Sequence, residues 1–362
     1  MSARLIVVGG FLGAGKTSAI LRLADMFIAD GKKVGIVTND QSENLVDTHF
    51  LRGEGKTVLE VTRGCFCCNF DGFTLKLRSM SQTEFPDVIL AEPVGSCTDL
   101  VATIFKPMMN SYTRDFKLAP LSVLADPRRI KKFITAAKTG FINEINYLFD
   151  KQLSEADIIL INKCDLLDGS ELDEITTFLR KNYPGAEVMP VSALTGEGYD
   201  AWLDKLTQGN AADKPSCEID YDIYARAEAA LGWYNSFTTV TTPVKTDINA
   251  FVASMLERIR LECSANGYEI AHIKAYAVTG LDSVKASITA TDGTVSFAKK
   301  SEFNAEKFNL ILNARVEASP GELECICEHS MKSTAADMNA ELCDYRAECF
   351  APSYPTPKHR MK

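Results

Sequence analysis

The stretch GGFLGAGKTS, residues 9–18, decides the fold of the first half of this chain. It follows the apolar run 4–8, which predicts a buried strand, and it precedes the segment 16–30, where apolar residues recur at helical spacing. Its glycines and Lys16-Thr17 fit the phosphate-loop pattern G-x-x-x-x-G-K-[ST]. Between a strand and a helix, such a loop wraps backbone N–H groups around phosphates, and the helix N-terminus favours their negative charge. The stretch therefore predicts a nucleotide site.

Two side chains of this loop have expected roles. Lys16 should reach the β- and γ-phosphates, and the Thr17 hydroxyl should bind Mg²⁺. The residues of the loop that we expect to bind the nucleotide are Gly13, Ala14, Gly15, Lys16, Thr17 and Ser18.

The bulk composition is that of a globular protein and excludes several classes of partner. With 362 residues the chain is long enough for two cores. Its net charge of −9 argues against a nucleic-acid partner, which would need a clustered basic face. No apolar run approaches the roughly 18 residues of a membrane span. The opening MSARLIVVGG reads as the first strand rather than as a signal peptide, so we expect a cytoplasmic protein with no membrane partner.

Short β-branched runs alternate with amphipathic segments over about the first 205 residues. This alternation predicts an α/β domain with a mostly parallel, doubly wound sheet, whose ligands bind at the carboxyl ends of the strands. The predicted strands are 4–8, 33–38, 57–62, 88–91, 121–125, 157–161 and 187–191.

A polar stretch, QGNAADKPSCEIDYD at 208–222, indicates a linker. It divides the chain into a phosphate-loop domain over 1–207 and a smaller α+β domain over 223–340, for which a ferredoxin-like fold is expected. The second part reads as strand 233–242, helix 247–264, strands 270–278, 283–290, 294–298 and 308–317, and helix 320–338. Residues 341–362, with two cysteines and three prolines, read as a mobile tail.

Two further motifs at predicted strand ends identify the base of the nucleotide. In Asn162-Lys163-Cys164-Asp165, the Asp165 carboxylate can accept hydrogen bonds from N1–H and N2–H₂ of guanine, a pair that adenine lacks. Asn162 and Lys163 would brace the loop and cover the base. The backbone N–H groups of Ser192, Ala193 and Leu194 could meet the guanine O6. Together with the phosphate loop, these motifs predict binding of GTP and GDP and argue against a small-molecule kinase.

The predicted strand 88–91 runs into Glu92-Pro93-Val94-Gly95. Such a strand end places an acid near the water shell of Mg²⁺ and a glycine N–H near the γ-phosphate, where loss of the phosphate is sensed. A strand-end ion pair is the alternative role of Glu92. The segment 39–43 reads as a first switch, and Asp40 within it is open to contact with a magnesium water, activation of the attacking water or metal ligation. The expected catalytic residues are thus Lys16, Asp40 and Glu92.

The stretch GCFCC at 64–68 places three thiols within four residues. Cys65, Cys67 and Cys68 can converge on one ion such as Zn²⁺, Cu⁺ or Co²⁺, and a trio without a fourth ligand suits an ion that is passed on. A redox pair and plain packing are the alternatives, and Cys97, two residues past Gly95, is a possible fourth ligand. We expect the 11 cysteines of the chain to be reduced.

The set GGFLGAGKTS, GCFCC, EPVG, NKCD and VSAL resembles the CobW/HypB/UreG group of phosphate-loop GTPases, and its CobW-like branch in particular. The resemblance covers about 1–205. It implies a GTP-dependent metallochaperone, with Cys65, Cys67 and Cys68 as the metal site and GTP-dependent homodimers as a common assembly. Two departures stand out. Asn39-Asp40-Gln41-Ser42 replaces the branch's Asn-Glu-Phe-Gly, and the chain lacks a His-rich stretch, which argues against a metal-storage role and against nickel as the metal.

Two functions follow from these motifs. The leading one is a GTP hydrolase that delivers or installs zinc, cobalt or a corrinoid in a client metalloenzyme or corrinoid protein, with slow intrinsic hydrolysis because no arginine finger is evident. The alternative is a regulatory G-protein chaperone that gates or reactivates such an enzyme without carrying metal. A second cysteine cluster, Cys325, Cys327, His329, Cys343 and Cys349, reads as buried thiols on a helix, a second metal site or a thiol relay.

Overall fold

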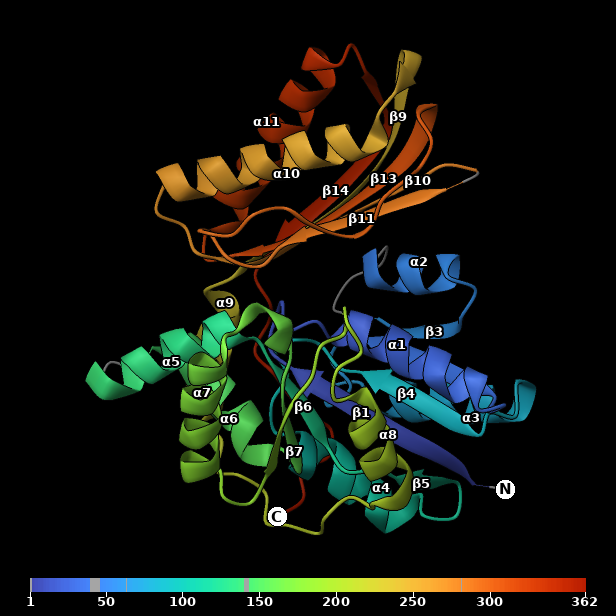
Figure 1. Cartoon of the computed structure of the whole chain (residues 1–362), viewed down its shortest axis with the longest axis vertical. Helices are drawn as coiled ribbons and strands as arrows, with labels where there is room; N and C mark the ends of the chain where they lie inside the picture. The colour runs from blue at the N-terminus through green and yellow to red at the C-terminus, as the bar shows by residue number, and fades with distance from the viewer. Residues whose placement is uncertain (1, 40–45, 63, 140–142, 281) are drawn as a thin grey trace. The chain divides into compact units, whose positions relative to one another are not determined.

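The computed structural model describes residues 2–39, 46–62, 64–139, 143–280 and 282–362. The chain folds into two compact units (Figure 1). The first unit comprises 1–41, 56–227 and 354–362, and the second comprises 42–55 and 228–353. Each unit is therefore built from segments that are far apart in the sequence.

The first unit is organised around an eight-stranded sheet whose paired strands are all parallel. The strand order is β3-β2-β4-β1-β6-β7-β8, and β5 pairs with β1. Most of these strands are apolar and β-branched because both faces of a parallel sheet are covered. The strands are β1 (Ala3–Gly10), β2 (Val34–Asn39), β3 (Thr57–Val61), β4 (Val88–Glu92), β5 (Phe116–Leu118), β6 (Ser122–Ala125), β7 (Ile158–Ile161) and β8 (Glu187–Pro190).

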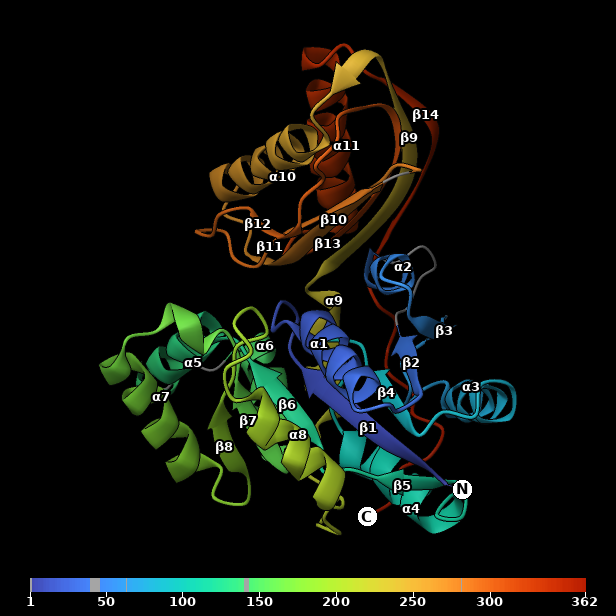
Figure 2. The same ribbon diagram turned by 45° about the vertical axis from the view of Figure 1, so that its right-hand side comes forward.

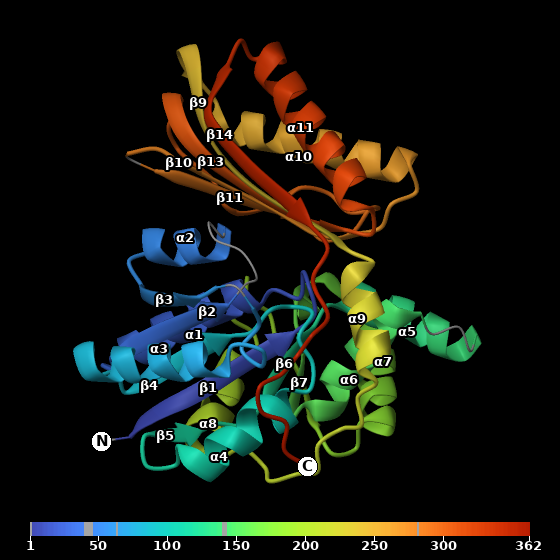
Figure 3. The same ribbon diagram turned by 180° about the vertical axis from the view of Figure 1, so that it is seen from behind.

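Helices cover both faces of this sheet. Figure 2 shows α1 and α8 on one face, and Figure 3, seen from behind, shows α3, α4 and α6 on the other. The helices are α1 (Lys16–Ala29), α3 (Phe70–Thr83), α4 (Lys106–Ser111), α5 (Pro127–Thr139), α6 (Glu144–Glu155), α7 (Gly169–Asn182), α8 (Tyr199–Gln208) and α9 (Tyr221–Ala229), with a π-helical turn at Val101–Phe105 before α4. The predicted doubly wound α/β fold is confirmed.

The second unit has a six-stranded antiparallel sheet in the order β12-β11-β10-β13-β9-β14. Helices α10 and α11 pack on one face of it (Figure 2). Its elements are β9 (Gly232–Thr246), α10 (Ile248–Ala265), β10 (Ile270–Val278), β11 (Ser283–Ile288), β12 (Ser296–Lys299), β13 (Ala305–Val316), α11 (Pro320–Asp337) and β14 (Glu341–Phe350). The core of β9-α10-β10-β13-α11-β14 is a ferredoxin-like split βαβ arrangement, and the α+β prediction is confirmed.

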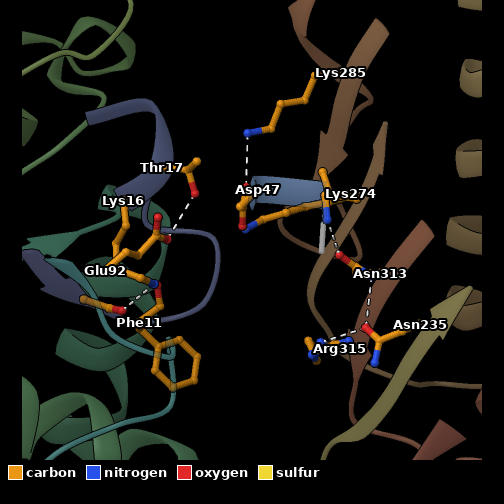
Figure 4. Close-up of polar contacts among 12 residues, drawn as sticks. Phe11, Lys16, Thr17, Asp47, Glu92, Asn235, Lys274, Lys285, Asn313 and Arg315 are labelled. Carbon is orange, nitrogen blue, oxygen red and sulfur yellow. Dashed lines mark hydrogen bonds and ion pairs between the residues drawn. The ribbon is translucent and has the colours of Figure 1, made fainter. Parts of the chain in front are cut away.

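Helix α2 (Val46–Gly53) packs in the second unit, although it lies in sequence between two strands of the first. Asp47 forms ion pairs with Lys274 and with Lys285, where the two charged atoms are 3.1 Å apart (Figure 4). Ile273 and Ala275 belong to the core under α10 and α11, so the alternating Lys274 lies on the opposite sheet face. Burial raises the pKa of the Asp47 carboxyl, but the two lysines outweigh burial and hold that pKa well below its usual range.

The structure differs from the predicted mobile tail at 341–362. Residues 341–350 form β14, which pairs with the outer edge of β9 and packs Leu342 and Tyr345 against the core. The Tyr345 and Tyr234 hydroxyls are hydrogen-bonded at 2.7 Å. Residues 354–362, hereafter the terminal segment, belong to the first unit. The prolines and basic residues of this region predicted a solvated chain, whereas backbone pairing with distant segments fixes it.

Residues 209–220 have no regular secondary structure, within the stretch expected to be a linker. The short strand β5 was not predicted, because three residues carry too little periodicity. No helix in the described ranges is long and apolar enough to cross a membrane.

Candidate functional site

The phosphate loop joins the end of β1 to the start of α1. Gly10, Gly13 and Gly15 all have positive φ, at 135°, 78° and 92°, where residues with a Cβ are strained. A Cβ on Gly10 would lie 2.4 Å from the carbonyl oxygen of Leu124, so only glycine fits against β6. Gly15 precedes Lys16 as the N-cap, and the first turn of α1 is directed at the loop. This is the backbone geometry of an anion site.

Lys16 and Thr17 are buried at the start of α1, with exposed fractions of 7% and 4%. Lys16 Nζ donates hydrogen bonds to the carbonyl oxygens of Gly10 at 2.8 Å and Phe11 at 3.3 Å. The Thr17 hydroxyl donates to Glu92 Oε1 at 3.0 Å (Figure 4). These three predicted catalytic and magnesium-binding side chains are therefore brought together at the carboxyl ends of β1 and β4.

Gly95 also lies beside the phosphate loop. A Cβ on Gly95 would be 3.0 Å from Lys16 Nζ and 2.6 Å from a methyl carbon of Leu12. The loop after β4 thus contacts the residue that is expected to hold the γ-phosphate. Asp40, the remaining predicted catalytic residue, lies outside the described residues.

The predicted base-binding loops are tied to the phosphate loop through Asn162. Its Nδ2 donates to the carbonyl oxygen of Ala14 at 2.7 Å, and its Oδ1 accepts from the N–H of Ala193 at 3.3 Å. Lys163 Nζ donates to the carbonyl oxygen of Gly13 at 3.1 Å. Asn162 and Lys163 therefore connect their own loop to the phosphate loop, and Asn162 also connects it to the loop that contains Ala193.

The other residues that are predicted to bind the nucleotide lie in the same loops or in the first turn of α1. Asp165 is exposed in the short 3₁₀ turn Cys164–Leu166, where its carboxylate is accessible to a base. Ser192 is buried, and its Oγ accepts from the N–H of Thr195 at 3.1 Å. Leu194 is 80% exposed. Ser18, in the first turn of α1, is partly buried.

Sequence reasoning missed Asp126, which ion-pairs with Lys163 at 2.6 Å. Its position directly after β6 is the signal that would have found it, because polar residues at strand ends face the ligand edge of such a sheet. The pair holds the Lys163 side chain across the loop that would receive the base.

The three cysteines of GCFCC form the cysteine cluster, whose thiols all lie within 4.8 Å of one another. Cys65 and Cys67 are buried and Cys68 is partly exposed. Their Sγ atoms are 2.6 Å apart for Cys65 and Cys67, and 3.9 Å apart for Cys67 and Cys68. Hydrogen bonds from Cys67 and Cys68 lower the pKa of the Cys65 thiol, so the cluster stabilises a thiolate, which is the form that binds metal.

Asn39, at the end of β2, braces the loop that carries this cluster. Its Nδ2 donates to the carbonyl oxygens of Val61 at 2.9 Å and Gly64 at 2.8 Å, and its Oδ1 accepts from the N–H of Phe66 at 2.7 Å. The Phe66 ring stacks on Phe73 of α3 at 4.1 Å. The cluster therefore sits on a fixed loop rather than on a loose one.

The second group of predicted candidates is not brought together as a site. In the described ranges, the cysteine cluster is the only group of three or more ligand side chains with metal-binding spacing. Cys325 is exposed, Cys327 on the inner face of α11 is buried in the core, and the Cys343 thiol contacts the Thr241 hydroxyl at 3.9 Å. His329 points to Ser333 on the exposed face of α11.

Two zinc chaperones are among the curated proteins that this chain resembles. The zinc chaperone CobW of Sinorhizobium sp is 30% identical over 227 residues, which are 57% of this chain and 63% of that protein. The zinc chaperone YeiR of Escherichia coli K12 is 29% identical over 221 residues, 59% of this chain and 61% of that protein. The chain thus covers less than two thirds of the length of these relatives.

Solved structures give more distant similarities. HypB from Helicobacter pylori in complex with nickel is 19% identical and covers 59% of this chain and 92% of its own, with a TM-score of 0.41. The Zn(II)-bound YjiA GTPase from E. coli is 14% identical and covers 93% of this chain and 99% of its own, with a TM-score of 0.39.

The family model described as CobW/HypB/UreG, nucleotide-binding domain, matches residues 4–190. This range contains the phosphate loop, the cysteine cluster and the Asn162 junction described above. Since the match spans more than half of the sequence, the chain belongs to the CobW/HypB/UreG family.

Proposed function

We propose that this chain is a GTP-hydrolysing metallochaperone that binds a zinc ion at Cys65, Cys67 and Cys68 and passes it to a client protein. The observation that carries the proposal is the position of the three thiols. They lie within 4.8 Å of one another on a loop that Asn39 ties to the end of β2, the strand that leads into the expected first switch. The names of the two zinc chaperones among its relatives support zinc as the cargo.

The residues of the phosphate loop suit binding and hydrolysis of GTP. Lys16 already points at carbonyl oxygens of its own loop, and phosphate oxygens would take their place as acceptors. When Mg²⁺ accompanies the nucleotide, it neutralises phosphate charge, and Thr17 is the residue that would hold it. Glu92, freed from the Thr17 hydroxyl, would orient a water molecule at the magnesium shell. Asp165 would select guanine.

Hydrolysis would reach the thiols through the loop after β4. Gly95 contacts Lys16, so the loss of the γ-phosphate changes the position of this loop first. A change in affinity for the ion between the GTP and GDP states is the coupling that such a chaperone requires. The slow hydrolysis expected from the sequence fits a protein whose client accelerates the reaction.

Zinc binding under reducing, anaerobic conditions tests the proposal. Zn²⁺, Co²⁺ and Ni²⁺ are titrated into the protein with GDP and with a non-hydrolysable GTP analogue. The Cys67→Ser variant removes one thiol of the cluster, and Cys325→Ser, at an exposed position of the second unit, is the matched control. We expect one zinc ion per chain, lost in Cys67→Ser, retained in Cys325→Ser, and bound severalfold more tightly in one nucleotide state.

The absence of binding in both nucleotide states would overturn the carrier function. That result would favour a regulatory GTPase that gates or reactivates a metal or corrinoid enzyme. The cysteine cluster would then serve as a docking surface or as a redox sensor. A client effect that survives in Cys67→Ser would identify that alternative.

A further inference from the structure

A fourth thiol reaches the cysteine cluster from another part of the sheet. Cys97, on the loop after β4, is 2% exposed. Its thiol is in hydrogen-bonding contact with the thiols of both Cys65 and Cys67. The strand order β3-β2-β4 explains the approach, because the carboxyl ends of β3 and β4 are separated only by β2. Two loops that are about 30 residues apart in sequence thus converge on one point.

Side chains of α6 hold the Cys97 loop in place. Gln152 Nε2 donates to the carbonyl oxygens of Gly95 and Cys97, both at 2.9 Å. Glu155 accepts from the Thr98 hydroxyl at 3.1 Å and from the N–H of Val101 at 3.0 Å. Both side chains are buried, so these contacts are shielded from water and rigid. These contacts therefore fix the backbone of the loop that carries Cys97.

We propose that Cys97 is the fourth ligand, so that Cys65, Cys67, Cys68 and Cys97 form one tetrahedral four-thiolate site for a zinc-like divalent cation. The inference rests on the proposed function, because it assumes that the cysteine cluster binds a cation. The inference adds a fourth ligand to the three of the GCFCC stretch. This ligand comes from the loop after β4, which is expected to sense the γ-phosphate. The ion would then bridge the two loops directly, since Cys97 is two residues from Gly95.

Binding of a four-coordinate ion requires the thiols to move, because Cys97 does not share the 4.8 Å spacing of the three cluster thiols. Zinc–sulfur bonds of about 2.3 Å in a tetrahedron place the sulfur atoms about 3.8 Å apart. The Cys67 and Cys68 thiols, at 3.9 Å, already have this spacing. The Cys65 and Cys67 thiols, at 2.6 Å, would separate by about 1 Å as the ion enters between them.

The terminal segment covers this site. The N–H of Lys358 donates to the carbonyl oxygen of Cys67 at 3.1 Å, and the backbone of Thr356 hydrogen-bonds the Cys68 thiol. Figure 3 shows the segment running along the face of the first unit that carries α4 and α6. The backbone hydrogen bond at Cys68 would offset part of the negative charge of its thiolate, and the Lys358 contact holds the segment against the backbone of the cluster.

X-ray absorption on the zinc-loaded full chain, combined with competition titration against a chelator, tests the assignment. We expect four sulfur neighbours at about 2.3 Å in the wild-type protein. Cys97→Ser should retain zinc with three sulfur neighbours and one lighter atom, and should bind it at least about tenfold more weakly. Cys263→Ser, a buried thiol of α10 outside the cluster, is the control and should keep four sulfur neighbours.

The outcomes separate this inference from the proposed function. Three sulfur neighbours in the wild-type protein, or unchanged coordination and affinity in Cys97→Ser, would overturn the fourth ligand while leaving the chaperone intact. A wild-type protein that binds no zinc would overturn both. GDP affinity and the thermal unfolding midpoint are measured for every variant, and Cys97→Ala replaces Cys97→Ser if the latter does not fold.

Discussion

Arg360 and Asp99 form an ion pair with 2.7 Å between Nε and Oδ2, which fastens the terminal segment to the loop that carries Cys97. Asp99 is fully buried and has a positive φ of 64°, and its Oδ2 also accepts from the Tyr221 hydroxyl at 2.6 Å. Burial raises the pKa of the Asp99 carboxyl, and the hydrogen bonds from Tyr221 and Arg360 act in the opposite direction. The pair therefore joins the terminal segment, which contacts Cys67, to the loop that carries Cys97.

The rate of zinc loss should depend on this pair. Arg360→Ala removes a charged hydrogen bond worth about 1.5 kcal/mol or more, so zinc should transfer to a chelator about tenfold faster. Deletion of 354–362 should accelerate the loss further. Stopped-flow competition with a chromophoric chelator measures the rate, and Lys362→Ala, exposed in the same segment, should leave it unchanged. Equal rates in all variants would show that the terminal segment does not control access to the ion.

Hydrolysis should depend on the charge of Glu92. Glu92→Gln keeps an oxygen that accepts from the Thr17 hydroxyl but removes the negative charge beside the expected magnesium site. We expect GTP binding to persist and single-turnover hydrolysis to fall by about a hundredfold. The control is Glu84→Gln, at an exposed position after α3. Hydrolysis at the wild-type rate in Glu92→Gln would assign Glu92 to a structural hydrogen bond alone.

The base specificity should change in Asp165→Asn. The amide can no longer accept both guanine hydrogen bonds, so GTP affinity should fall by about a hundredfold or more. Xanthine has a carbonyl where guanine has its amino group, and the asparagine N–H₂ can donate to that oxygen, so xanthosine triphosphate should bind better than in the wild-type protein. Fluorescent-nucleotide competition measures both affinities. Asp168→Asn, the N-cap of α7, serves as the control, and an unchanged preference for GTP would remove Asp165 from the base site.

The first unit should become less stable as the pH rises from about 4.5 to 7. Burial raises the pKa of the Glu155 carboxyl to about 7, with the N–H of Val101 opposing the shift. Because the folded state then holds a proton that the unfolded state has lost, the free energy of unfolding falls across this window and levels off above it. The effect of this group amounts to at most roughly 3 kcal/mol.

Glu155→Gln should remove this pH dependence, because glutamine has no titrating proton. Its Oε1 can accept from the N–H of Val101, and its Nε2 can donate to the Thr98 hydroxyl, which reverses the direction of that bond. Guanidinium unfolding at pH 5 and pH 8, followed by the fluorescence of Trp202 in a Trp233→Phe background, measures the first unit alone. The variant should gain stability relative to the wild-type protein at pH 8. Parallel pH profiles of the two proteins would contradict the raised pKa.

The residues of the candidate nucleotide site could be grouped from the sequence because its features are local. The phosphate loop needs glycines at fixed offsets, and Asn162 and Glu92 each follow a run of buried β-branched residues that marks a strand end. Strand ends of a parallel sheet meet at one edge, so local patterns alone place these residues near one another. The alternation of apolar residues likewise marked most elements of both sheets.

The contacts around the cysteine cluster were harder to predict because they join distant segments. Lys358 lies about 290 residues from Cys67, and Arg360 lies about 260 residues from Asp99. Nothing in the periodicity of a Pro-rich, basic stretch indicates which backbone groups it will meet. Helix α2 has a recognisable amphipathic pattern, but its place in the second unit depends on contacts with distant residues, among them the ion pairs of Asp47 with Lys274 and Lys285.

The terminal segment also sets the order in which the site can be completed during translation. Residues 354–362 belong to the first unit, yet the ribosome synthesises them only after the whole second unit. At 5–20 residues per second, the 290 residues between Cys68 and Lys358 take roughly 15 to 60 s to add. Throughout that interval the terminal segment cannot yet contact Cys67 and Cys68 of the nascent chain. The thiols of the cluster are then more accessible to a metal donor or an oxidant. Once residues 354–362 have been added, they would enclose an ion that the cysteines had already bound.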